Sequence, residues 1–236
     1  MNNGKHRKSP ATTKLLQQQG QCRKSVLAVL KSQFQAGDVV EVKVKHGGKY
    51  FYGFYDNLQK AADEAARSNT VDSTASYGIN PRDPANCPVT NRLGTMSGAQ
   101  HSQILKRKKL LIDIVHRRPP SSVARCKERI ASRQLAEKII DAMKTNFGWP
   151  GPDLISTGRG TQLIYRIDLP TNDNGLTKSV LQWIGNRFLT GNLVEIDIKT
   201  HYPNQLAPLP GTDFVGRGKS GLCRYRIRIL RRGSLS

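Results

Sequence analysis

The stretch Lys108-Lys109-Leu110-Leu111-Ile112-Asp113-Ile114-Val115 decides how the rest of this 236-residue chain is interpreted. Its run of apolar residues is typical of a short buried strand, with a single carboxylate, Asp113, near the far end. Side chains two residues apart on a strand face the same side of a sheet, so Val115 and Asp113 are expected on one face. The stretch predicts a strand that delivers one acid to the edge of a site.

The charge of the chain indicates its partner. The formal net charge is +21, and residues 1–24 and 217–232 contain basic residues and no acid. Such an excess repels itself unless it meets a polyanion, and nucleic acid is the usual one. The alternative is a basic but merely soluble surface with a disordered tail. We favour nucleic-acid binding.

Other classes of protein are disfavoured. No apolar run approaches the roughly 18–20 residues that cross a bilayer, and the basic N-terminus lacks the apolar stretch of a secretory signal. The four cysteines form no Cys-x-x-Cys pair, which argues against a zinc site or a disulfide framework. We expect an intracellular (cytoplasmic) protein with no membrane contact. A Gly-x-x-x-x-Gly-Lys-Ser/Thr phosphate loop is absent, so any helicase would act in trans.

Hydrophobic periodicity predicts two α/β modules after a basic, disordered arm over residues 1–24. The modules are residues 25–105 and 106–236, with mostly antiparallel sheets and a cleft between them, an α+β fold. A loop is expected over residues 80–105. Helices are predicted over residues 23–34, 58–67, 123–146 and 178–189, and strands over 38–45, 49–55, 74–79, 108–115, 153–157, 162–169, 193–199 and 224–230.

Four motifs follow one another in a suggestive order. They are Gly53-Phe54-Tyr55-Asp56 with Tyr77-Gly78-Ile79-Asn80-Pro81; Leu111-Ile112-Asp113-Ile114-Val115-His116-Arg117-Arg118-Pro119; Gly148-Trp149-Pro150-Gly151-Pro152 leading to residues 156–167; and Ile196-Asp197 with Tyr202-Pro203-Asn204-Gln205-Leu206 and Leu209-Pro210-Gly211-Thr212. In this order they resemble the archaeo-eukaryotic primase–polymerase superfamily, in the form carried by plasmids, phages and mobile elements. The resemblance covers about residues 25–230.

The resemblance implies an N-terminal α/β module packed on an RRM-like module. It also implies template-directed transfer of nucleotides from nucleoside triphosphates on single-stranded DNA, in the replication of a plasmid, phage or mobile element, with Mg²⁺ or Mn²⁺ held by carboxylates. Asp113 and Asp197 would be the catalytic metal ligands. The nucleotide would be bound by Ser156, Gly158, Arg159, Gly160 and Gln162. From the residues alone, the turn Gly158-Arg159-Gly160 suits either a simple hairpin or a phosphate cradle.

The chain departs from the family at functional positions. Val115 stands where the family has a second acid, and it cannot bind a metal. Gln162 stands where the family has a histidine, and it carries no positive charge. Tyr202 and Gln205 replace an expected Asn and Arg. His116 would point to the opposite face of a regular strand. These departures predict reduced or lost catalysis; the alternative to an enzyme is a non-catalytic, primase-fold protein that binds DNA or RNA.

Basic residues around the expected cleft are predicted to contact backbone phosphates, which position a strand without reading its sequence. The alternative for such charge runs is a solvated face. The predicted nucleic-acid-binding residues are Arg82, Lys108, Lys109, Arg117, Arg118, Arg217 and Lys219.

Overall fold

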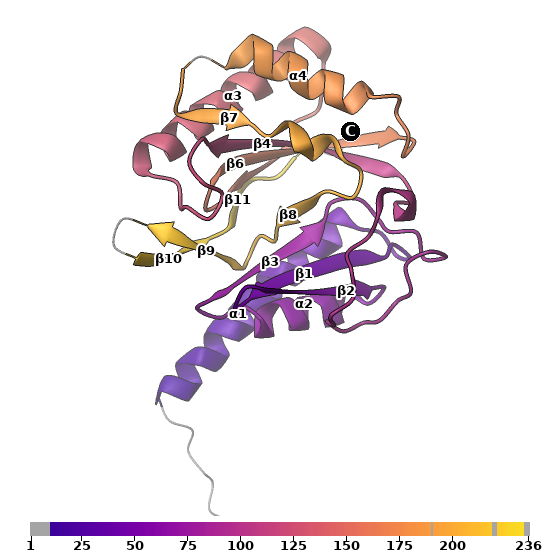
Figure 1. Cartoon of the computed structure of the whole chain (residues 1–236), viewed down its shortest axis with the longest axis vertical. Coiled ribbons are helices and arrows are strands. Elements are labelled where there is room, and N and C mark those ends of the chain that lie inside the picture. Colours follow the sequence, from indigo (N-terminus) through magenta and orange to yellow (C-terminus); the bar gives the residue numbers. More distant parts are fainter. Residues whose placement is uncertain (1–9, 190, 219–220, 234–236) are drawn as a thin grey trace, which may run out of the picture.

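The computed structural model describes residues 10–189, 191–218 and 221–233, with side chains from residue 16 onward. Two main antiparallel sheets lie one above the other (Figure 1); α3 and α4 cover the upper sheet, and α1 and α2 pack on the lower one. This mixed architecture confirms the predicted α+β fold. No described helix is long and apolar enough to cross a membrane.

The first sheet has the strand order β2-β1-β3-β8 and packs on helices α1 and α2. Its elements are α1 (Pro10–Gln33), β1 (Val40–His46), β2 (Lys49–Tyr55), α2 (Leu58–Arg67), β3 (Ser73–Gly78) and β8 (Leu206–Pro208). Alternation in β1 buries Val40, Val42 and Val44 on the helix side, as the sequence pattern predicts. Gly47 and Gly48 both have positive φ (53° and 80°), the conformation of a two-residue hairpin turn whose twist matches the strands.

The second sheet has the order β11-β5-β6-β4-β7, and its outer face is covered by α3 and α4. Its elements are β4 (Arg107–His116), α3 (Cys126–Phe147), β5 (Asp153–Ser156), β6 (Gly160–Leu169), α4 (Leu176–Phe188), β7 (Val194–Ile196) and β11 (Arg228–Arg231). Leu110, Ile112 and Ile114 of β4 pack under the helices. Leu111 instead joins the core of the first sheet. The opening stretch of sequence is therefore a central strand buried on both faces.

The C-terminal part of the chain ties the two halves together. β8 belongs by sequence to the expected second module, residues 106–236, but it pairs with β3 of the first sheet. β9 (Asp213–Gly218) and β10 (Gly221–Arg226) then form a separate antiparallel pair, and Val215 N donates to Thr74 Oγ1 of β3. Short 3-10 helices are η1 (His101–Gln103) and η2 (Ile198–His201).

Three local predictions differ from the structure. Residues 10–24 were expected within a disordered arm, but they begin the helix α1, in which Cys22 is buried; residues 1–9 of that arm lie outside the described residues. The predicted strand over 193–199 ends at Ile196, because Asp197 caps η2. The predicted edge strand over 224–230 divides at Ile227, which is buried and donates its N–H to Thr212 O.

Candidate functional site

Two paired strands, together with the residue that follows β7, bring the predicted acids close to Gln162. Asp113 of β4 lies opposite Gln162 of β6, and Asp197 N donates to Asp113 O at 2.9 Å. Asp113 and Gln162 alternate with residues that pack under the helices, so they lie on the sheet face that is turned toward the first module. Arg159, from the turn between β5 and β6, brings a positive charge close to Asp113.

Burial dominates the electrostatics of Asp113. It raises the pKa of this carboxyl to about 6 because the charged form loses its water. The charge of Arg159 and a hydrogen bond from Gln162 oppose this effect, whereas the charge of Asp197 adds to it. Among the described residues, Asp113 Oδ1, Gln162 Oε1 and Arg159 Nε have no hydrogen-bond partner. Buried polar atoms are nearly always paired, so this cluster is suited to a polar ligand.

The donor set does not fit a site for two divalent cations. Val115 is 1% exposed and lies in register between Gly160 and Glu195, where a second carboxylate would be needed. Glu195 is directed to Arg117, 4.0 Å away. No group of three His, Cys, Asp or Glu side chains within the described ranges is arranged to hold a metal. Two cations that bridge a triphosphate and an attacking oxygen require several converging carboxylates.

The side chains of Asp197 and His116, close to Asp113 in the sheet, each make one structural hydrogen bond. Asp197 Oδ1 accepts from Lys199 N at 3.0 Å, which caps η2. His116 lies on the opposite face from Asp113, as predicted, and its Nε2 lies 2.9 Å from Ser122 O. Asp113 and Asp197 are thus the two carboxylates that could share one cation.

The turn between β5 and β6 is explained by packing. A Cβ on Gly158 would come within 2.1 Å of the Phe214 ring, and one on Gly160 within 2.0 Å of Ile114 O. The backbone N–H groups of Arg159 and Gly160 point to Thr157 Oγ1, at 3.3 and 3.1 Å. These two N–H groups are therefore engaged within the hairpin. In this turn, the Arg159 side chain remains available to contact a phosphate. Ser156 Oγ lies 2.6 Å from Tyr225 Oη.

Two basic residues predicted to bind nucleic acid are buried instead. Arg82 is fully buried and forms an ion pair with Glu41 (2.6 Å). Lys109 Nζ donates to Gln33 O and Ile79 O at 2.7 and 3.0 Å, and burial lowers its pKa to about 7. This burial argues against direct contacts of Arg82 and Lys109 with a nucleic acid.

The other predicted contacts differ in accessibility. Lys108 pairs with Asp38 at 3.2 Å. Arg118 forms two hydrogen bonds of 2.7 Å to Glu128, which lower the pKa of that carboxyl to about 2. Arg117 and Arg217 are exposed and remain candidates. Lys219 lies outside the described residues.

The sequence analysis missed a basic aromatic face on β1 and β2. Lys43 lies opposite Tyr52, and Lys45 opposite Tyr50. Lys43 Nζ is 4.4 Å from the centroid of the Tyr50 ring and 5.6 Å from that of Tyr52. We call these four residues the Lys–Tyr face. Its signal was present in the alternation of DVVEVKVK and KYFYGFY, which sends Lys43 and Lys45 to the side opposite the buried valines.

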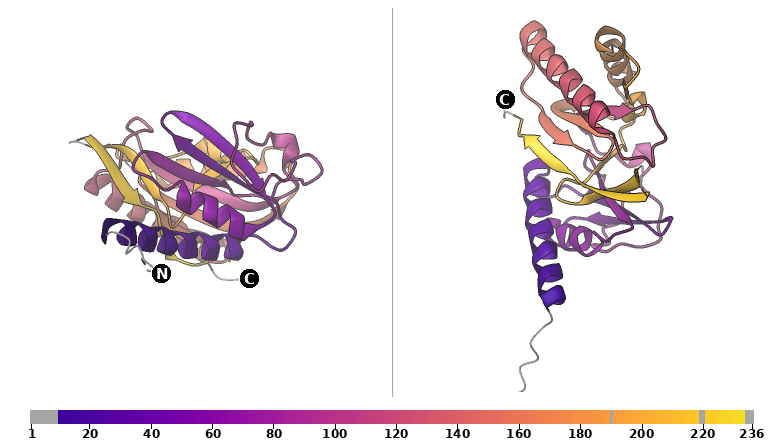
Figure 2. Two further views of the ribbon diagram at one scale, coloured as in Figure 1. Left: turned by 90° about the horizontal axis from the view of Figure 1, so that it is seen from below. Right: turned by 90° about the vertical axis from the view of Figure 1, so that its left-hand side faces the viewer.

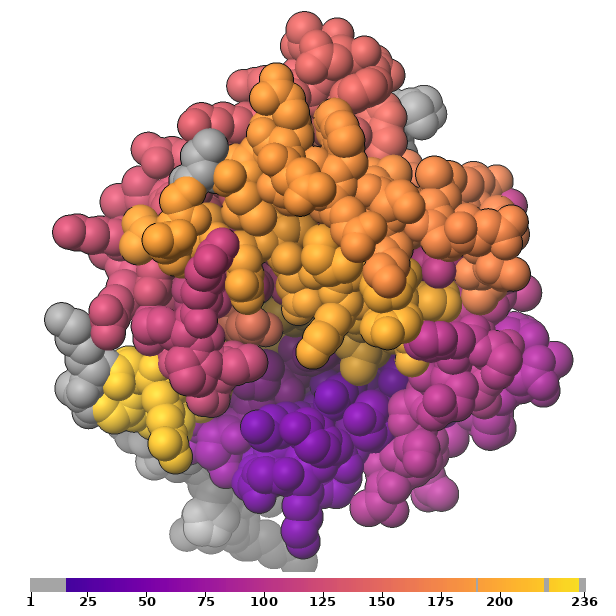
Figure 3. All heavy atoms as spheres, turned by 45° about the horizontal axis from the view of Figure 1, so that its top comes forward, coloured from indigo at the N-terminus to yellow at the C-terminus, as the bar shows by residue number. Residues whose placement is uncertain are grey.

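The Lys–Tyr face lies on the open side of the first sheet. Figure 3 shows this side hollowed between the side chains of residues near 45–55 (purple) and those of the segment near residues 195–210 (orange to gold). β7, which carries Glu195, belongs to that upper segment. So does η2, which begins directly after Asp197. The hollow therefore has lysine and tyrosine on one side and the elements around Asp113 on the other.

Comparison with known proteins adds a fold relationship. No protein-family model matches the chain, and no curated protein matches it. Among solved structures, one described as "Crystal structure of primase RepB'" superposes with a TM-score of 0.51 at 10% identity, over 89% of this chain and 56% of that one. The chain has a primase-like fold.

The superposition concerns the backbone and does not test the four sequence motifs or their chemistry. At 10% identity the likeness concerns the fold alone. The chain spans about 56% of the length of the primase it superposes on. What the protein does must be argued from its own side chains.

Proposed function

We propose that this protein binds single-stranded nucleic acid in the hollow of its primase-like fold, and that its capacity for nucleotidyl transfer is reduced or lost. The Lys–Tyr face carries the binding part of the proposal. Sequence-independent binding of single strands combines cationic side chains that follow the backbone with aromatic rings on which bases stack. Lys43, Lys45, Tyr50 and Tyr52 supply both on one sheet face.

The net charge of +21 supports the same proposal. Of the predicted phosphate contacts, Arg117 and Arg217 are exposed, and Arg117 lies at the end of β4 beside Glu195. Binding that is dominated by phosphates weakens steeply with salt, with a slope close to the number of phosphates neutralised. A DNA template in the replication of a plasmid, phage or mobile element, with a helicase acting in trans, is the setting we propose.

Reduced catalysis rests on the buried Val115. A valine that is 1% exposed cannot supply a metal ligand beside Asp113, and Gln162 cannot supply a positive charge to a triphosphate. Binding of the strand needs neither residue.

A second candidate is a nucleotidyltransferase that uses a single Mg²⁺ or Mn²⁺. The observation in its favour is that Asp113 has an unpartnered oxygen next to Asp197. In that case both carboxylates would hold the cation, Arg159 would contact the nucleotide, and extension of a primer would depend on Asp113.

The binding proposal is tested by fluorescence anisotropy with a labelled single strand. Lys43→Glu is the test variant and Lys60→Glu the matched control, because Lys60 is exposed on α2, on the other side of the same sheet. We expect Lys43→Glu to weaken binding about tenfold and to reduce the salt slope by about one. We expect Lys60→Glu to stay within about twofold of the parent. Equal affinities for the two variants would contradict the proposal.

Stacking is tested separately with Tyr50→Ala. Tyr50 is 48% exposed, so the substitution leaves the core intact. Loss of one base-stacking ring costs about 1–3 kcal/mol, and this loss should persist at high salt, unlike that of Lys43→Glu. An unchanged affinity of Tyr50→Ala would remove stacking from the proposal.

A further inference from the structure

A groove on the other side of the first sheet is lined by arginines. It runs between α1 and the C-terminal segment that comprises β10 and β11, and has a volume of about 700 Å³. Figure 2 shows α1 (indigo) lying along the yellow C-terminal strands. Because α1 packs on the valine side of β1, this groove and the Lys–Tyr face lie on opposite faces of the sheet.

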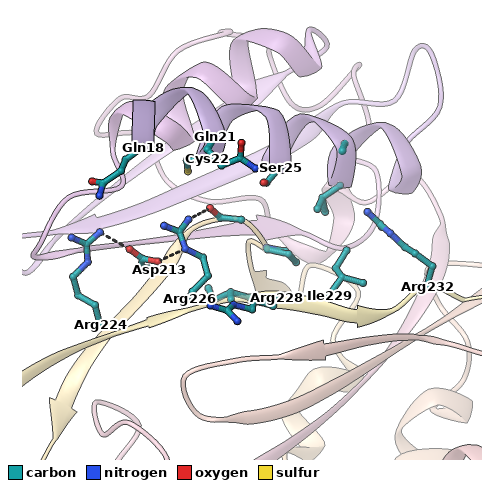
Figure 4. A pocket seen from close by; sticks show the side chains of 15 residues that line it. Gln18, Gln21, Cys22, Ser25, Asp213, Arg224, Arg226, Arg228, Ile229 and Arg232 are labelled. Atoms are coloured by element: carbon teal, nitrogen blue, oxygen red, sulfur yellow. Dashed lines mark hydrogen bonds and ion pairs between the residues drawn. The ribbon is translucent and has the colours of Figure 1, made fainter. Parts of the chain in front are cut away.

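Four arginines of the C-terminal segment line the groove against a single acid. Figure 4 shows Arg224, Arg226, Arg228 and Arg232 on one wall, with Asp213 between the first two. Both oxygens of the buried Asp213 are used, Oδ2 by Arg224 and Oδ1 by Arg226 at 2.8 Å. One carboxylate thus fixes two guanidinium groups and neutralises only one of their charges. Each guanidinium has five N–H donors, so further donors remain for a ligand.

The next two arginines are less neutralised. Arg228 is exposed, and its side chain has no hydrogen bond or ion pair with any other residue that the structure describes. Arg232 donates to Ser32 Oγ at 2.7 Å and lies 4.0 Å from Asp153. The facing wall of α1 presents Gln18, Gln21 and Ser25, which are polar and uncharged. The groove therefore has a clear excess of positive charge.

The shape of this charge favours a polymer. The four arginines come from two successive strands, β10 and β11, and Figure 4 shows them spaced along the groove, so their guanidinium groups form a row and not a single converging pocket. A compact anion would engage one end of such a row, whereas a chain of phosphates engages its length. Amide and hydroxyl groups on the facing wall are suited to phosphate and sugar oxygens.

We propose that the groove between α1 and the C-terminal strands is a second binding site for a nucleic-acid backbone, reached by a strand long enough to extend beyond the hollow. We call it the arginine groove. The proposal rests on the proposed function for the identity of the polymer. It implies contacts to phosphates and not to base edges, hence no preference for sequence.

The test variant is Arg228→Glu, since the absence of a partner for Arg228 lets the substitution leave the fold intact. Its control is Arg187→Glu, an exposed position on α4, which covers the outer face of the second sheet. Thermal melting of both variants checks folding. With a labelled strand of about 30 nucleotides, we expect Arg228→Glu to bind about tenfold more weakly and with a salt slope lower by about one. Arg187→Glu should bind within about twofold of the parent.

Measuring Lys43→Glu in the same assay separates this proposal from the proposed function. If Lys43→Glu weakens binding while Arg228→Glu and Arg187→Glu do not, the proposal that the arginine groove binds nucleic acid is overturned. The proposal that the hollow binds a single strand is then supported. Equal losses for Arg228→Glu and Arg187→Glu would indicate a general effect of net charge and would also overturn the groove. If neither Lys43→Glu nor Arg228→Glu weakens binding, both proposals fail.

Discussion

Replacing Asp113 with asparagine should stabilise the protein at neutral pH. Burial raises the pKa of Asp113 from 3.8 to about 6, and a difference of this size corresponds to about 3 kcal/mol. The sign follows from proton binding. Below about pH 4 the carboxyl is protonated in both the folded and the unfolded state, so it does not affect stability. Between about pH 4 and 6 the unfolded state loses the proton first, and folding stability falls as pH rises.

Above about pH 6 Asp113 is ionised in both states, and its burial lowers the folding stability by the full amount. Asparagine has a similar shape and no charge, so Asp113→Asn should raise the free energy of unfolding at about pH 7 by up to about 3 kcal/mol. For a chain of this size that is a rise in Tm of roughly 6–12 °C. The difference in Tm between variant and parent should vanish near pH 4.

Calorimetry across this pH range measures the effect, with Asp168→Asn as the control. Asp168 is exposed and pairs with Lys106 at the surface, so its substitution should change Tm little at any pH. A Tm for Asp113→Asn at or below that of the parent at neutral pH would refute the reasoning. So would a gain in Tm that is equally large at pH 4 and pH 7.

Three further predictions concern the fold and the surface. Arg82→Met should destabilise the protein by about 3–5 kcal/mol in denaturant unfolding, because Glu41 would be left as an unpaired buried charge; a stable variant with weaker nucleic-acid binding would restore the original prediction for Arg82. Gly160→Ala should lower Tm strongly, since its Cβ would lie 2.0 Å from the Ile114 carbonyl oxygen; an unchanged Tm would refute the close approach. Lys43→Glu should weaken binding of a single strand about tenfold, and an anisotropy titration that matches the parent would refute this.

The sheets could be predicted because their signals are local. Val40, Val42 and Val44 alternate with polar residues, and the structure buries all three under the helices. The apolar run before Asp113 likewise becomes a central strand. Such periodicities depend on the strand geometry alone.

Helix α1 could not be predicted over its whole length, because tertiary packing decides it. Residues 10–22 are polar and contain Gly20. Glycine lowers helix propensity. Yet Cys22 and Val26 are buried in the first core. Packing of one face stabilises a helix that its sequence alone would not specify.

Asp113, Gln162 and Asp197 were expected from the order of motifs as site residues, and the fold brings them close together. Asp113 and Gln162 lie opposite each other on adjacent strands, and Asp197, directly after β7, donates its N–H to Asp113 O. Their role in a site stays a prediction. The basic contacts were harder, since charge in a sequence does not reveal burial. Arg82 is paired with Glu41, which is 41 residues away in the sequence. No local sequence pattern predicts that partner. The Lys–Tyr face was visible as alternation, but its role depends on which side of the sheet remains open.

The most direct test of the central claim is a primer-extension assay on the purified protein. It would contain primed and unprimed single-stranded template, nucleoside triphosphates, and Mg²⁺ or Mn²⁺, with binding of the template followed in the same samples. We predict that the parent binds template in a salt-dependent manner but does not extend it, and that Val115→Asp combined with Gln162→His is the variant most favourable to gaining extension. Metal-dependent extension by the parent that Asp113→Ala abolishes would contradict the account.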